Sequence, residues 1–247
     1  MSEANIWNFK EDGDLSGYTL IVPSVAVGNV GQLACDLLIS SLDMVKIASV
    51  YSPALIPVIG YDPYDLNSSK LASSCEIFKC AARNLVVLQM RAPLIYKHAR
   101  LFLEDLAKKF KERNIKDIVI LTSSFAHEKK HISTSPFRYL ATDSSSFKSK
   151  VKTFNWLEHE AHDTQLRIYG GGFASMFYEI CGENSLPCLL LYKYCSEGNN
   201  IPDAYDMIQY LANLMPLFSE KSDLVSQLIQ PVSWKLLFGR PPPKDIY

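Results

Sequence analysis

The stretch KHARLFLEDLAKKFKERNIKDIVIL, residues 97–121, carries the clearest information about the fold. Its first part places apolar side chains on one stripe with charged residues opposite, which predicts an amphipathic helix over about residues 97–113. Residues 117–121, DIVIL, are an apolar and largely β-branched run that predicts a buried strand. A helix that leads directly into a buried strand is typical of an α/β protein whose sheet is covered on both faces.

The same alternation extends toward the start of the chain. Residues 18–22 predict a first buried strand, residues 24–31 a turn, and the spacing of Ala34, Leu37, Leu38 and Leu42 one face of a helix. Further strands are expected over residues 46–51 and 55–59, interrupted by Pro53, and a hairpin over residues 75–80 and 85–90.

The second half of the chain continues this pattern after a polar gap. Residues 122–163 lose periodicity and are expected to be loops. A helix from Gly170–Gly172 to residue 180, a strand over 188–192, a helix that begins near Pro202 and a short helix over 221–229 follow. Three consecutive prolines then predict an extended spacer. We therefore expect one α/β domain, residues 1–239, and a Pro-rich tail, residues 240–247.

Charge and hydropathy limit the class of protein. The formal net charge is −1, from 25 basic and 26 acidic residues, so no net field favours nucleic acid or an anionic membrane as a partner. No apolar run approaches the ~18 to 20 residues of a membrane helix, and the first residues lack the features of a signal peptide. The six cysteines form no CxxC pair and are expected to be reduced thiols in the core. We expect a soluble intracellular protein.

Two glycine-rich segments and one serine pair are candidates for chemistry. Gly28 and Gly31 flank a GNVG turn, which lacks the third glycine of a dinucleotide site and the Lys-Ser/Thr of a P-loop. Gly170–Gly172 has no nearby basic pair or acidic ribose ligand, so close packing is the favoured interpretation of both segments. Ser123 and Ser124 are expected just beyond a strand end, but without a G-x-S-x-G elbow they are assigned to capping or a turn.

The histidines offer two spacings that suit a metal. His127 and His131 are four residues apart, and His159 and His162 are three apart. No third ligand is identifiable, and histidines in polar loops are usually solvated, so a metal site is not favoured. The sequence thus predicts no catalytic residue, no cofactor site, no metal ligand and no enzyme activity.

The carboxyl end contains the one candidate binding motif. An extended spacer carries an aliphatic side chain, Ile246, and a tyrosine with a free carboxylate, Tyr247. Such an end can place an apolar anchor, a ring with a polar tip and one negative charge in a partner's pocket. The alternative is a frayed terminus, and composition alone leaves both open.

Five segments together resemble the proteasome assembly chaperone 2 family, and the similarity runs along most of the chain. They are PSVAVGNVGQLA at 23–34, SPFRYL at 135–140, GGG at 170–172, SEGNNIPDA at 196–204 and SWKLLFG at 233–239.

The resemblance implies a three-layer α/β/α sandwich with a largely parallel or mixed central sheet, similar to nucleoside phosphorylases. It implies a heterodimer with proteasome assembly chaperone 1 that binds the proteasome α-subunit ring, promotes assembly of the 20S core and prevents off-pathway α-ring dimers. It implies no reaction and no cofactor, and the cytoplasm and nucleus are the expected locations. The alternatives are an α/β enzyme related to nucleoside phosphorylases and a scaffold for another protein assembly.

The wider family uses a carboxy-terminal motif of a hydrophobic residue, a tyrosine and any residue, whose carboxylate meets a lysine between adjacent α subunits. Ile246 and Tyr247 supply the first two positions, but no residue follows Tyr247 in this sequence. The anchoring role of Ile246 and Tyr247 is therefore a hypothesis that the resemblance suggests.

Overall fold

The computed structural model describes residues 5–10, 13–160 and 166–236. Within these residues the main sheet has eight strands in the order β1-β3-β6-β7-β2-β8-β10-β9. Their bounds are β1 Ile6–Phe9, β2 Thr19–Pro23, β3 Val45–Tyr51, β6 Cys75–Cys80, β7 Leu85–Met90, β8 Asp117–Phe125, β9 Phe137–Ala141 and β10 Cys188–Cys195. The four central strands β7, β2, β8 and β10 are parallel, and the strands outside them pair antiparallel. The sheet is therefore mixed.

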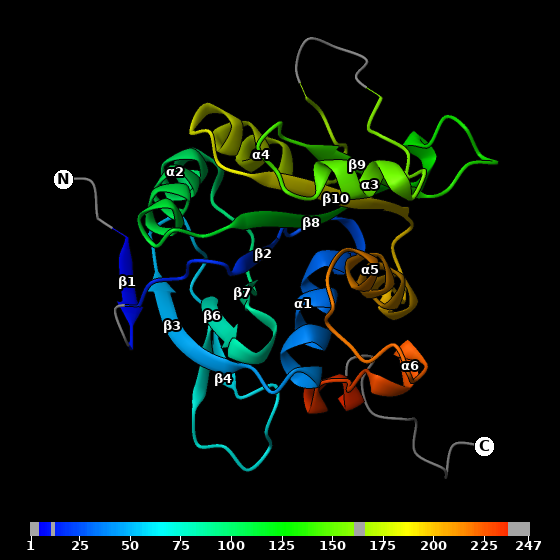
Figure 1. Ribbon diagram of the computed structural model, residues 1–247. Helices are drawn as coiled ribbons and strands as arrows, with labels where there is room; N and C mark the ends of the chain where they lie inside the picture. The colour runs from blue at the N-terminus through cyan, green and yellow to red at the C-terminus, as the bar shows by residue number, and fades with distance from the viewer. Residues whose placement is uncertain (1–4, 11–12, 161–165, 237–247) are drawn as a thin grey trace.

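Helices cover both faces of this sheet (Figure 1). α1 (Val30–Ser41) and α5 (Ile201–Leu214) lie on one face, and α2 (Tyr96–Glu112) and α4 (Ala174–Glu183) lie on the other. The shorter elements are α3 Lys148–Thr153, α6 Leu224–Gln227 and the 3-10 turns η1 Val27–Asn29, η2 Ala81–Arg83, η3 Ala126–Glu128 and η4 Val232–Leu236. The predicted α/β class and the three layers are confirmed.

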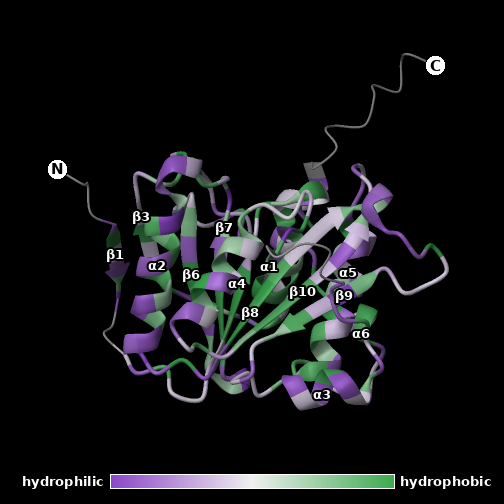
Figure 2. Cartoon of the chain, turned by 90° about the horizontal axis from the view of Figure 1, so that it is seen from above, coloured by the Kyte–Doolittle hydropathy of each residue, from purple (hydrophilic) through white to green (hydrophobic). Residues whose placement is uncertain are grey.

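Each central strand contributes to two cores. In β8, Val119 and Leu121 pack with α1 and α5, whereas Ile118 and Ile120 pack with α2 and α4, and all four are fully buried. The strands in the middle of the sheet are consequently hydrophobic over most of their length (Figure 2). Burial on both faces removes the alternation of polar and apolar residues, which is why these strands appear in the sequence as continuous apolar runs.

Two local predictions are confirmed closely. The expected hairpin is formed by β6 and β7, with Cys75 opposite Met90 and Cys80 opposite Leu85. Asn84 lies in its turn with φ +47, a left-handed conformation that asparagine tolerates. The amphipathic pattern at 97–113 forms α2, and its predicted apolar stripe is buried.

The strand predicted over residues 55–59 is wrong. Only its last residue is in a strand, β4 (Ile59–Tyr61), which pairs with β5 (Leu71–Ser73) in a separate two-stranded sheet. Pro53 and Pro57 have no backbone N–H to donate, so the segment between them cannot complete a strand ladder. The backbone is held instead by Ser74, whose hydroxyl donates to Ile56 O at 2.8 Å.

The expectation of loops over residues 122–163 is also wrong in part. β8 continues to Phe125, and β9 and α3 lie within this region. Thr122, Ser123 and Ser124 are buried in the strand, because their hydroxyls bind backbone carbonyls of neighbouring loops. A polar composition therefore concealed the end of a buried strand.

The six cysteines are buried and none forms a disulfide, in agreement with their predicted role as core thiols. No helix among the described residues has the length and apolar character needed to span a bilayer. The tail, residues 240–247, lies outside the described residues, so the boundary after residue 239 stays a prediction.

Candidate functional site

The carboxyl ends of the parallel strands are where ligands bind in open α/β sheets. In this chain the loop after β2 meets the glycine segment there. Ser24 Oγ donates to Gly171 O at 2.8 Å and accepts from Phe173 N at 3.0 Å. Thr122 Oγ1 donates to the same carbonyl at 2.9 Å. These hydroxyls fasten the glycine segment to the strand ends.

The serine pair predicted to lie beyond a strand end lies inside β8 instead. Ser123 Oγ donates to Val27 O at 2.5 Å, and Ser124 Oγ donates to Tyr169 O at 2.9 Å. A nucleophilic serine gives its proton to an adjacent base, whereas both of these protons are directed to backbone carbonyls. Their geometry supports a structural role.

Close packing accounts for the two glycine-rich segments. Gly28 has φ +65, and a Cβ on it would lie 2.6 Å from Cγ of Asn200. Gly172 has φ +62, and a Cβ there would lie 2.2 Å from Val25 O. At Gly172 the contact is with the backbone, and at both positions the positive φ disfavours a side chain, which agrees with the packing interpretation of both segments.

The three candidate histidines within the described residues each lie beside a carboxylate or a hydroxyl. His127 Nε2 lies 3.6 Å from Glu128 Oε1, and His159 Nδ1 lies 2.8 Å from the Tyr192 hydroxyl. His131 is exposed, and His162 lies outside the described residues. Over the part of the chain that the structure describes, no three His, Cys, Asp or Glu side chains are grouped to hold a metal ion.

A second candidate site is a projecting segment that we call the arm, residues 51–73. The arm connects β3 to β6 and carries β4 and β5. Near its start, Ala54 and Leu55 pair with the chain just before α2, and the part with β4 and β5 extends away from α2 and α4 (Figure 1). Its exposed large apolar side chains are Tyr51, Ile56, Val58, Ile59, Tyr61, Leu66 and Leu71. Ile59 is 73% exposed and Tyr61 is 89% exposed. The arm therefore presents an apolar surface to solvent.

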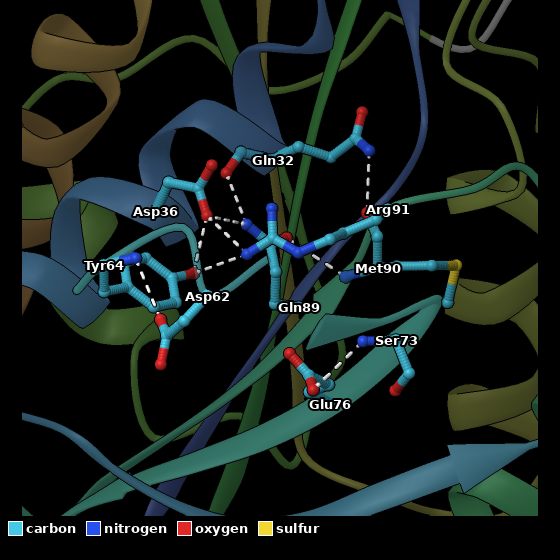
Figure 3. Close-up of polar contacts among 9 residues, drawn as sticks. All are labelled: Gln32, Asp36, Asp62, Tyr64, Ser73, Glu76, Gln89, Met90 and Arg91. Atoms are coloured by element: carbon cyan, nitrogen blue, oxygen red, sulfur yellow. Dashed lines mark hydrogen bonds and ion pairs between the residues drawn. The ribbon is translucent and has the colours of Figure 1, made fainter. Parts of the chain in front are cut away.

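A buried polar cluster ties the arm to the main body (Figure 3). Oδ1 of Asp36, on α1, accepts hydrogen bonds from Tyr64 Oη at 2.6 Å, Gln89 Nε2 at 2.6 Å and Arg91 Nη2 at 3.2 Å. Arg91 Nη2 also donates to the Tyr64 hydroxyl at 2.9 Å. The carboxylate, the guanidinium and the phenol together join α1, the end of β7 and the arm.

The electrostatics of this cluster keep Tyr64 protonated. Burial raises the pKa of Tyr64 well above its ordinary value, and the neighbouring charge of Asp36 raises it further. Burial lowers the pKa of Arg91, but Asp36 and Tyr64 outweigh burial and the net shift is upward. The phenol stays a donor and the guanidinium stays charged through the neutral range, so the hydrogen bonds persist there.

Further contacts hold the arm at its base. Glu76 forms an ion pair with Lys46, and its Oε1 also accepts from Ser73 N at 3.2 Å. The Ser74 hydroxyl accepts from Val58 N at 2.7 Å. Between β3 and the arm lies a groove of about 560 Å³, lined in part by Tyr51, Leu55, Pro57, Val58, Ile59 and Leu71. These contacts hold the backbone that carries the exposed apolar side chains.

No motif in the sequence predicts this cluster. Asp36, Tyr64 and Arg91 lie 27 to 55 positions apart, so no spacing in the sequence points to their contact. The available signal was the run from Ile47 to Tyr61, which contains no charged residue and does not match a single helix or strand.

The predicted tail anchor, Ile246 and Tyr247, lies outside the described residues. The last described element, η4, lies beside the arm, because Ser233 N donates to Pro63 O at 3.2 Å. The end of the described residues therefore lies close to the arm.

Comparisons with known proteins agree with this architecture. A family model described as the PAC2 family matches residues 20–228. The chain is 36% identical over 254 residues to human proteasome assembly chaperone 2, which covers 95% of this chain and 96% of the relative. The corresponding protein of Saccharomyces cerevisiae is 24% identical over 259 residues, with 92% and 96% covered.

Solved structures show the same fold at low identity. Pyrococcus furiosus PbaA, an archaeal homolog of proteasome-assembly chaperone, aligns with a TM-score of 0.69 at 13% identity, covering 90% of this chain and 91% of that chain. Pyrococcus furiosus PbaB, an archaeal proteasome activator, aligns with a TM-score of 0.66 at 14% identity, covering 90% and 92%.

Proposed function

The chain belongs to the PAC2 family, and on that premise we propose that it is a chaperone of proteasome assembly that acts as a heterodimer with proteasome assembly chaperone 1. The observation that carries the proposal is the 36% identity to human proteasome assembly chaperone 2 over nearly the whole of both chains. The heterodimer binds the α-subunit ring of the 20S core and prevents α rings from dimerising off the assembly pathway. We propose the cytoplasm and the nucleus as its locations.

Action by binding, without catalysis, fits the site geometry. The hydroxyls of Ser24, Ser123 and Ser124 are engaged with backbone carbonyls at the strand ends where an α/β enzyme places its chemistry. The relatives matched along their length are named as chaperones. The most exposed apolar side chains of the arm provide contact area for another protein.

We propose a smaller contribution from the tail. Ile246 offers an apolar anchor and Tyr247 a ring with a polar tip, which suits a pocket between two α subunits. Deletion of residues 246–247 is expected to weaken α-ring binding when the tail of chaperone 1 is deleted as well. If this doubly truncated pair binds the α ring as tightly as the intact pair, the tail does not contribute to binding.

Affinity purification of the tagged chain from its own cells, followed by mass spectrometry, tests the function. Proteasome α subunits and chaperone 1 are the expected companions. If neither is recovered at low salt, the proposal is wrong. A thermal-shift measurement with nucleosides and phosphate tests the phosphorylase alternative, because a ligand that binds the folded state raises its melting temperature. Clear stabilisation by both would favour an enzyme.

A further inference from the structure

The arm exposes more apolar surface than is usual for a soluble monomer. Seven large side chains contribute to it: Tyr51, Ile56, Val58, Ile59, Tyr61, Leu66 and Leu71. With roughly 150–250 Å² for a fully exposed aromatic side chain and somewhat less for an aliphatic one, they expose on the order of 700 Å². Tyr51, Val58, Ile59 and Leu71 line one groove, and Tyr61 lies opposite Leu71, so these five form one patch that contributes most of the area. Soluble monomers rarely expose a contiguous apolar patch beyond a few hundred Å². The area equals about one partner's share of a standard protein interface.

The chemistry of the arm matches a lasting contact. No charged residue lies between Tyr51 and Tyr61, whereas Asp62, Asp65 and Lys70 follow in the rest of the arm. The interior of a permanent interface is apolar and depleted in charge, and its rim is polar. A protein that is released after assembly is expected to bind through a more polar surface, because transient interfaces are less hydrophobic than permanent ones. Of the two partners in the proposed function, the other subunit of the heterodimer therefore fits the arm better than the α ring does.

The arm is also prepared for binding. Tyr64 fixes it to Asp36 and Arg91, and Ser74 fixes Val58 and Ile56 at its base. Because the backbone is already held, a partner pays little ordering entropy when it docks. Tyr61 and Ile59 project from this fixed frame with 89% and 73% exposure, which makes them the expected energetic centre of the contact.

We propose that the arm is the surface on which this chain holds its partner subunit, chaperone 1, through a complementary apolar surface on that protein. The identity of the partner rests on the proposed function, whereas the location of the contact rests on the exposed area, the uncharged stretch 51–61 and the fixed backbone of the arm.

The test is an affinity measurement between the purified full chain and chaperone 1. In the arm variant, Ile59→Asp and Tyr61→Asp are combined. The control variant combines Ile132→Asp and Tyr96→Asp, which change the same residue types at 87% and 85% exposure outside the arm. We expect the arm variant to bind chaperone 1 roughly 100-fold more weakly or worse, and the control to stay within about 3-fold of the unchanged chain. Both variants are expected to keep the melting temperature of the unchanged chain.

The outcomes separate the inference from the function. If the unchanged chain binds chaperone 1 and the arm variant binds equally well, the location is wrong while the proposed function stands. If the unchanged chain does not bind chaperone 1, the heterodimer and the location both fail. If the arm variant instead converts a homodimer of the chain to monomers, the occupant is a second copy and the proposed partner is wrong.

Hydrogen exchange provides a readout that needs no substitution. The backbone amides of β4 and β5 are expected to exchange several-fold more slowly when chaperone 1 is bound. Unchanged exchange in the arm, with protection at another surface, would overturn the location.

Discussion

The hydroxyl of Tyr64 donates a 2.6 Å hydrogen bond to Oδ1 of Asp36, so the loop between β4 and β5 is fastened to a helix that packs on the central sheet. Asp36 is buried, and Arg91 supplies the countercharge. The position of the arm is thereby coupled to the packing of the core. The exposed apolar surface of the arm is held in place by polar contacts inside the chain.

Tyr64→Phe tests this coupling. The variant loses a hydrogen bond to a charged group, so the free energy of unfolding is expected to fall by about 2 kcal/mol in urea titrations. In the variant, the amides of β4 and β5 should exchange faster than they do in the unchanged chain, with the amides of β8 as the reference. Tyr61→Phe is the control, because Tyr61 is 89% exposed and its change should stay within about 0.5 kcal/mol. Equal stability of both variants would show that the cluster does not hold the arm.

Gly172→Ala and Gly182→Ala are expected to act in opposite directions. A Cβ at Gly172 meets Val25 O at 2.2 Å and φ is +62, so this variant should be destabilised by about 2 kcal/mol or more. Gly182 lies in α4 with nothing within 4 Å of a Cβ, so alanine there should stabilise by about 0.5–1 kcal/mol. Thermal unfolding of the two variants measures both signs. A neutral Gly172→Ala would contradict the close approach of the two loops.

Ser24→Ala should destabilise the chain by about 1–3 kcal/mol. The serine hydroxyl donates to Gly171 O and accepts from Phe173 N, and its removal leaves two buried backbone groups without this partner. Ser69→Ala, at an exposed position of the arm, is the matched control and should be neutral. Chemical denaturation compares the two. If both variants lose the same amount of stability, the structural role assigned to Ser24 is wrong.

Stability is expected to fall above about pH 9. Burial, assisted by the charge of Glu76, raises the pKa of the Cys75 thiol far above its ordinary value of 9.0. The folded chain therefore keeps this proton where the unfolded chain loses it, so the contribution is complete below pH 9 and declines as the pH rises. The loss is about 1.4 kcal/mol per pH unit for one group.

Urea titrations at pH 7 and pH 10 measure this dependence. Cys75→Ala removes one thiol that titrates in the unfolded chain, so its stability should decline less steeply with pH than that of the unchanged chain. Tyr64 and Cys35 are shifted in the same direction by burial and preserve part of the slope in the variant. Identical slopes for both proteins would contradict the assignment to Cys75.

Local patterns in the sequence determined the layers, the β6–β7 hairpin and helix α2. In each of these elements the apolar residues lie within a few positions of one another, so their period appears in the sequence without knowledge of any distant contact. The same reasoning assigned residues 122–124 to a loop, because three consecutive polar residues do not fit a buried strand unless their partners are known. Their partners are carbonyls of segments such as Gly171 and Tyr169, more than 40 positions away.

The tertiary structure decided the arm and its attachment. Asp36, Tyr64 and Arg91 are unremarkable polar residues in the sequence, and they form a buried cluster only because the sheet brings α1, the arm and the end of β7 together. A buried charge is tolerated only where a countercharge and hydrogen-bond partners are present, and those partners come from distant parts of the chain. The sequence alone could therefore determine the class of fold and the family, whereas the proposed binding surface required the three-dimensional arrangement.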